Sequence, residues 1–285
     1  MNELNERFKY LREAIGFYIR LLLCQMGAEV LVLTSSGALT MTVGMSDLEM
    51  MEAMFELLAQ NSHRMIIVTY LLLSVVLWMR RRRTGNTPLV LVDGLDKSVS
   101  GAEAFWGAVM GAGGCLWAAI LMELLGGKAT PFEAFVANGA DVLSANTEPR
   151  WLQFVAIVLF SSFFEEYIFR GLIFSRFRRI MSPMGALICQ AFVFASMHAG
   201  GAASTSAMIT GTVMGLVVMK TGSLRGAIAA HAGFNLMSFM ASPLYDAIFA
   251  SPDTTKTIFA ASAVVFALGA VFFFRSGTKS ASGKS

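Results

Sequence analysis

FFEEYIFRGLIF, residues 163–174, places two adjacent glutamates and an arginine inside an apolar run. Ionisable side chains within a membrane helix are costly unless they pair with each other or line a wet cavity. Glu166 and Arg170 are one helical turn apart on the same face, where they can form an ion pair. Successive helical residues point about 100° apart, so Glu165 faces elsewhere and has no partner on its own helix. Glu165 is therefore the candidate general base of a site inside the membrane.

The composition excludes an ordinary soluble domain. Of 285 residues, 55% are hydrophobic and 14% are charged, and the mean hydropathy is +0.62. A helix needs about 20 mostly apolar residues to cross a hydrocarbon core of about 30 Å. We predict an all-α polytopic membrane protein in which about eight transmembrane helices enclose an intramembrane active-site cavity. The expected spans are 14–33, 65–79, 103–125, 151–174, 184–199, 203–219, 226–242 and 257–274.

The charges between these spans predict the orientation of the chain. Four arginines follow the second span at 80–83, and further basic residues follow the fourth, sixth and eighth spans. The segments on the other side carry mainly aspartate and glutamate. Because basic loops stay in the cytoplasm, we expect both termini to be cytoplasmic and the protein to lie in the plasma (inner) membrane. The net charge of +3 is explained by this pattern and indicates no nucleic-acid partner.

We expect two regions along the chain. Residues 1–102 form an N-terminal two-helix region with an outer amphipathic helix and a basic inner loop, and residues 103–285 form a catalytic helical core with a mobile C-terminal tail. The outer helix is expected over 46–60, because Ser46 and Glu49 have capping-box spacing and the apolar residues repeat with a helical period. Glycines that permit close helix contact are expected at Gly111, Gly113, Gly114, Gly211 and Gly215.

Two histidine motifs accompany the glutamates. His231 and Asn235 are one turn apart in HAGFN, so both side chains leave one face of the seventh span. An imidazole and a carboxamide there can donate hydrogen bonds to an oxygen that gains negative charge during acyl attack. His198 ends FASMH, and Phe194, one turn earlier, can wall a cavity and hold the imidazole in one rotamer. The combination of these groups on three helices predicts a functional site.

The three motifs resemble those of the CPBP (CAAX protease and bacteriocin-processing) intramembrane proteases, a family that includes the type II CAAX prenyl endopeptidases and the abortive-infection proteins. The family's EExxxR motif corresponds to residues 165–170, FxxxH to residues 194–198 and HxxxN to residues 231–235. Three motifs in order on successive membrane helices are a specific signal, whereas one alone is weak.

The resemblance implies a peptidase in which a carboxylate activates water. Carried over residue by residue, Glu165 is the general base and His198 orients the water. His231 and Asn235 stabilise the tetrahedral intermediate. The supporting residues are Glu166, Arg170 and Phe194.

We therefore expect an intramembrane endopeptidase that needs no cofactor and cleaves a membrane-anchored or lipidated protein, such as a prenylated, CAAX-like one. Two alternatives stay open. One carboxylate and two imidazoles are also the ligand set of some catalytic zinc sites, although the sequence has no HExxH motif. A non-enzymatic membrane immunity or binding protein with the same fold is the second alternative, because retained motifs do not measure turnover.

The depth of His198 in the membrane conflicts with this simple arrangement. Glu165 and His231 are expected in the cytoplasmic half of the membrane, whereas His198 lies near the outer end of a span that begins at residue 184. We expect the fourth and fifth helices to extend beyond the inner surface, which would bring His198 to the depth of Glu165.

Overall fold

The computed structural model describes residues 2–36, 45–85, 99–126, 148–198, 201–241 and 245–282. Every regular element within these ranges is a helix, and none of the described residues forms a strand. The predicted all-α fold class is confirmed. Most of the expected basic inner loop, residues 86–98, lies outside the described residues.

The predicted spans coincide with helices of the structure. In chain order the elements are α1 (Asn2–Ser35), α3 (Asp47–Gln60), α4 (Ser62–Arg83), α5 (Gly101–Gly126), α7 (Arg150–Phe154), the π-helix η1 (Val155–Ser161), α8 (Ser162–Glu165), the π-helix η2 (Glu166–Phe174), α9 (Ser175–Phe177), α10 (Pro183–Ala195), α11 (Gly201–Thr221), α12 (Leu224–Ala241), α13 (Tyr245–Ile248) and α14 (Pro252–Ser282). The run from α7 to α9 is one continuous helix and corresponds to the fourth predicted span. Helix α14 is longer than predicted and continues into the expected C-terminal tail.

Within the described residues, four helices are long and apolar enough to cross a membrane. They are Glu3–Ser35, Ser62–Arg83, Arg150–Phe177 and Pro252–Ser276. Large apolar side chains such as Leu23, Trp78 and Phe192 are exposed on the outside of the protein, as expected where helices face lipid. The chain is therefore a polytopic membrane protein, and the total of about eight spans stays a prediction.

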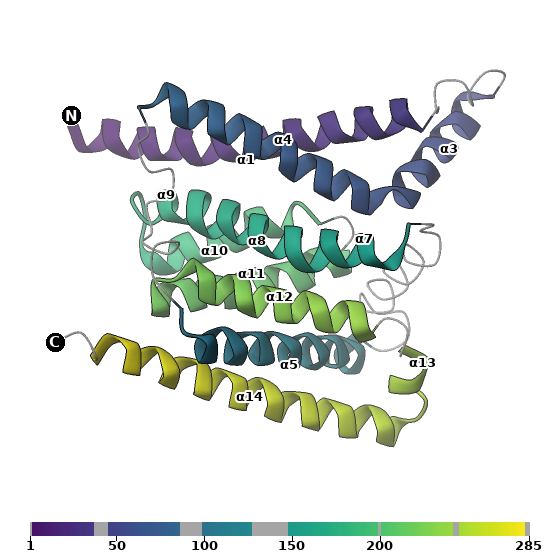
Figure 1. The fold of residues 1–285 in the computed structure, drawn as a ribbon, viewed down its shortest axis with the longest axis vertical. Coiled ribbons are helices and arrows are strands. Elements are labelled where there is room, and N and C mark those ends of the chain that lie inside the picture. Colours follow the sequence, from purple (N-terminus) through teal and green to yellow (C-terminus); the bar gives the residue numbers. More distant parts are fainter. Residues whose placement is uncertain are drawn as a thin grey trace.

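The helices lie side by side in a stack (Figure 1). The α1–α4 pair forms one edge, and the run from α7 to α9 packs next to it together with α10, α11 and α12. Helices α5 and α14 close the opposite edge, where α5 packs against both α12 and α14. The start of α1, the end of α14 and the arginine-rich end of α4 lie on the same side of the stack, at the left in Figure 1. This arrangement agrees with two termini on one side of the membrane.

Glycines let neighbouring helices approach closely, as predicted. A methyl group on Gly111 would overlap the carbonyl oxygen of Ala230 in α12, and one on Gly233 would overlap the carbonyl oxygen of Ala108 in α5. At these two positions of the α5–α12 crossing, any residue larger than glycine would therefore clash with the backbone of the neighbouring helix. The other predicted glycines that face a neighbouring helix are Gly113, Gly114, Gly211 and Gly215.

Helix α3 begins with the predicted capping box. The Ser46 side chain accepts from the backbone nitrogen of Glu49, and the Glu49 carboxylate accepts from the backbone nitrogen of Ser46 at 2.8 Å. Hydrogen bonds from Ser46 hold the pKa of Glu49 below its usual value. Leu48, Met51 and Phe55 are exposed. The predicted helix and its capping box are confirmed, and its amphipathic role on the outer membrane surface stays a prediction.

The run from α7 to α9 departs from regular α-helical geometry. The π-helices η1 and η2 flank the short helix α8, which ends at Glu165. A π-helix has i→i+5 hydrogen bonds, and such segments are frequent at functional sites. The 3.6-residue period therefore does not hold through this run, although Glu166 and Arg170 still meet on one side.

Helix α10 is short, and its end brings His198 to the same cavity as Glu165. Its 13 residues span about 20 Å, less than a hydrocarbon core of about 30 Å. His198 follows the end of this short helix and lines the same cavity as Glu165. The expected span 184–199 thus corresponds to the shorter helix Pro183–Ala195. Extension of the fourth and fifth helices beyond the inner surface stays a prediction.

Candidate active site

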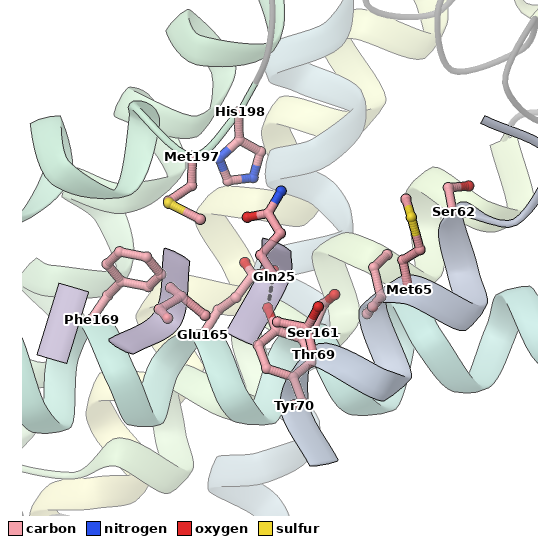
Figure 2. Close-up of a pocket in the computed structure, with 12 residues that line it drawn as sticks. Gln25, Ser62, Met65, Thr69, Tyr70, Ser161, Glu165, Phe169, Met197 and His198 are labelled. Atoms are coloured by element: carbon pink, nitrogen blue, oxygen red, sulfur yellow. Dashed lines mark hydrogen bonds between the residues drawn. The ribbon is translucent and has the colours of Figure 1, made fainter. Parts of the chain in front are cut away.

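Glu165 lies on the wall of a cavity of about 290 Å³ between the α1–α4 pair and the motif-bearing helices (Figure 2). Its side chain is 14% exposed. The carboxylate oxygen Oε1 accepts a hydrogen bond of 3.1 Å from the hydroxyl of Tyr70. The carboxylate that has no partner on its own helix therefore has one on α4.

His198 lines the same cavity. Its Nδ1 lies 3.0 Å from the backbone oxygen of Phe194. A carbonyl oxygen can only accept, so Nδ1 carries the hydrogen and Nε2 is an acceptor in the neutral ring. The imidazole also packs against the Phe194 ring, with 4.8 Å between the ring centroids. These two contacts orient the ring and leave Nε2 for a group in the cavity.

A buried ion pair lies on the other side of the same helix. Glu166 and Arg170 have fully buried side chains, and Nη1 of Arg170 is 2.9 Å from Oε1 of Glu166. The distance is that of an ion pair, but Nη1 does not have the geometry of a hydrogen-bond donor to this oxygen. The other terminal nitrogen of Arg170, Nη2, donates to the backbone oxygen of Gly211 at 3.2 Å. The ion pair predicted from the sequence is confirmed.

His231 connects the two glutamates. Its Nδ1 donates to Oε1 of Glu166 at 2.7 Å, and its Nε2 is 3.7 Å from Oε2 of Glu165. The imidazole is buried. Nε2 of His231 thus lies near Oε2 of Glu165, whereas Tyr70 binds the other oxygen, Oε1.

The side-chain amide of Asn235 forms hydrogen bonds to the α7–α9 run. Nδ2 donates to the backbone oxygen of Ile157 at 3.0 Å and to the hydroxyl oxygen of Ser162 at 3.1 Å. These bonds tie α12 to η1 and α8. The oxyanion role predicted for Asn235 would require the amide to release one of the two acceptors.

Phe194 packs between the two histidines. Its ring centroid is 4.9 Å from that of Phe169, 4.8 Å from that of His198 and 6.2 Å from that of His231. The guanidinium carbon of Arg170 lies 4.6 Å from the same centroid. The aromatic residues that line the cavity are Phe169 and Tyr70, and Phe194 lies behind them as a buried support for both histidines.

Residues 147–237 match the family model described as type II CAAX prenyl endopeptidase Rce1-like. The match contains all three motifs. This part of the chain belongs to the Rce1-like type II CAAX prenyl endopeptidase family. The resemblance predicted from the sequence is confirmed over these residues, and the apolar helices indicate an integral membrane protein. No curated protein and no solved structure matches the chain.

The match to the endopeptidase family leaves out two helices that complete the cavity. Helix α1 contributes Leu21 and Gln25 to the lining, and α4 contributes Thr69 and Tyr70 among others. In Figure 2 the carboxamide of Gln25 lies between His198 and Glu165. The site predicted from the sequence lies within residues 103–285 and does not include these side chains. Their only local signal is an uncharged polar residue in an otherwise apolar span, and that signal is weak.

The described residues also bear on the zinc alternative. No group of three His, Cys, Asp or Glu side chains among them is arranged to hold an ion. Glu165 and His231 approach each other, whereas Nδ1 of His198 is directed at a backbone oxygen. The zinc site stays an alternative prediction.

Proposed function

We propose that this protein is an intramembrane endopeptidase, in which water activated by Glu165 hydrolyses a peptide bond of a membrane-associated protein or peptide. One observation carries the proposal: Glu165 and His198 line one cavity, and Glu165 is backed by the buried contact between Glu166 and His231. The family match supports the reaction class, because the matched family is named for prenyl endopeptidases.

Glu165 acts as the general base in the first step. Its carboxylate takes a proton from water while the water oxygen forms a bond to the carbonyl carbon of the scissile peptide. His198 orients this water by accepting its second hydrogen at Nε2, since Nδ1 is occupied by the backbone oxygen of Phe194. The intermediate then collapses, the carbon–nitrogen bond breaks, and Glu165 returns its proton to the departing nitrogen. The products are a carboxylic acid and an amine.

His231 stabilises the oxyanion of the intermediate. Because Nδ1 donates to Glu166, Nε2 can donate only when the ring is an imidazolium. In that form the charges of His231 and Arg170 balance those of Glu166 and the oxyanion, because Glu165 has by then taken the proton from water. Asn235 would supply a second donor after releasing the hydroxyl of Ser162 or the backbone oxygen of Ile157.

The proposed substrate is a protein or peptide held in the bilayer by a lipid or a hydrophobic segment. The cavity lies among helices that are apolar enough to cross a membrane, so a membrane-held substrate can approach it from the bilayer. The name of the matched family adds prenylated proteins with a CAAX sequence to this class. The apolar side chains of the lining, such as Leu21 and Ile66, suit a peptide with apolar residues.

Replacement of the proposed base tests the function. Purified Glu165→Gln in liposomes should hydrolyse a prenylated CAAX reporter peptide at least about 100-fold more slowly than the parent, the lower end of the effect expected for a general base. Glu56→Gln is the matched control, because Glu56 lies on α3 and accepts a hydrogen bond from Gln60 at the surface. Hydrolysis by Glu165→Gln at the parent rate would show that the proposal is wrong. Comparison of peptide termini in membranes with parent and variant protein would identify the natural substrate.

A further inference from the structure

Tyr70 reaches the proposed base from outside the family match. It lies on α4, whereas the match covers residues 147–237. Its side chain is buried in the cavity wall, and its hydroxyl donates to Oε1 of Glu165 (Figure 2). The orientation of the proposed base thus depends on a helix of the N-terminal region.

The ring of Tyr70 is fixed by Phe164. The two rings are stacked, with 4.9 Å between centroids and 6° between planes. Phe164 immediately precedes Glu165, so one helical turn carries both the stacking partner of the ring and the acceptor of its hydroxyl. Phe164 in turn packs against Phe160 and Phe163. Since the ring is held by stacking and burial, the position of the hydroxyl is set before any substrate binds.

The hydroxyl makes the two oxygens of Glu165 different. Oε1 is bound to Tyr70, while Oε2 faces Nε2 of His231 at 3.7 Å. A free carboxylate can rotate and exchange its oxygens, whereas one that is hydrogen-bonded through a single oxygen cannot do so without breaking that bond. Among the described residues no hydrogen bond to Oε2 is found, so Oε2 is the oxygen that can accept one from a water.

We propose that Tyr70 is a positioning residue of the reaction, which holds Glu165 so that Oε2 takes the proton from water. The inference rests on the proposed peptidase function. A merely structural role is the rival explanation, because a buried tyrosine hydroxyl needs an acceptor wherever it lies. The two roles differ in outcome: loss of a structural bond lowers stability, whereas loss of a positioning bond lowers kcat in a folded protein.

Tyr70→Phe keeps the ring and removes only the hydroxyl. On the reporter in liposomes, kcat should fall about 10- to 100-fold, as for a lost hydrogen bond to a charged group, with KM unchanged. Tyr18→Phe is the matched control, because it removes a tyrosine hydroxyl that bonds to the Ser196 hydroxyl at 2.9 Å. This control should keep the parent kcat.

Infrared spectroscopy tests the same contact without turnover. The carboxylate band of Glu165 is assigned from the difference between the parent and Glu165→Gln. It should shift in Tyr70→Phe and stay in place in Tyr18→Phe. An unshifted band, or a Tyr70→Phe enzyme with the parent kcat, would overturn the role of Tyr70 while an inactive Glu165→Gln leaves the proposed function standing. Parent-like turnover by Glu165→Gln would instead overturn the function itself, and the role of Tyr70 with it.

Discussion

At the residue scale, Glu166 serves two neighbours with one oxygen. Oε1 is 2.9 Å from the Arg170 guanidinium and 2.7 Å from Nδ1 of His231, and the side chains of Glu166 and Arg170 are fully buried. Removing one partner of a buried pair leaves the other charge uncompensated, which costs more than the intact pair contributes. Glu166 therefore supports the position of His231 as well as the charge of Arg170.

Glu166→Gln should lower the free energy of unfolding by about 3–5 kcal/mol, because the Arg170 charge stays buried without its partner. Denaturant-induced unfolding in detergent micelles measures the loss. Glu3→Gln is the control, since Glu3 forms an exposed ion pair with Arg7 and should leave stability nearly unchanged. Equal stabilities of the two variants would contradict the buried-pair argument.

At the element scale, the crossing of α5 and α12 sets the position of the second histidine motif. The backbones meet where Gly111 faces Ala230 and Gly233 faces Ala108. Ala230 immediately precedes His231, so any separation of the two helices moves the imidazole away from Glu165 and Glu166. Small residues at a helix crossing thus have a direct consequence for the site.

Gly111→Ala should destabilise the protein by more than the roughly 1–3 kcal/mol typical of overpacking, because the added methyl group meets a backbone carbonyl that cannot rotate away. Loss of folded protein on size-exclusion chromatography and loss of reporter hydrolysis should occur together. Gly27→Ala is the matched control, since its methyl group would make an ordinary contact with Leu72 at 3.5 Å. A Gly111→Ala protein with parent stability would refute the close crossing.

At the scale of the whole molecule, Glu148 joins α4 to the part of the chain that matches the family model, residues 147–237. Its carboxylate accepts from the backbone nitrogens of His63 and Arg64, each at 3.1 Å, and lies 2.9 Å from Nδ1 of His63. The side chain is buried and caps the first turn of α4 from the start of the α7–α9 run. His63 is therefore part of the link that keeps α4 and its Tyr70 against the α7–α9 run.

Glu148→Gln should weaken this link by about 1–3 kcal/mol, because the amide retains one acceptor oxygen where the carboxylate has two. Hydrogen exchange measured by mass spectrometry should become faster in the first turn of α4. Glu103→Gln is the control: Glu103 caps the exposed start of α5 through Ser100, so its effect should stay in α5. Unchanged exchange at residues 62–66 of Glu148→Gln would argue against the link.

The sequence by itself determined the features that depend on composition or on residues a few positions apart. The apolar content sets the membrane class, and the spacing of Glu166 and Arg170 sets their ion pair. The Ser46–Glu49 capping box is equally local. Such features are encoded within one helical turn, where the geometry of the helix alone decides which side chains meet.

Only the tertiary structure decided which helices complete the site. Tyr70 and Glu165 are 95 residues apart in the chain, and His231 and Glu166 are 65 apart. Their meeting depends on how helices pack, which the periodicity of a single helix does not contain. The π-helical segments and the hydrogen bonds of the Asn235 amide could not be predicted from the sequence for the same reason. A backbone carbonyl of one helix meets a donor on another helix only after the two helices have packed together.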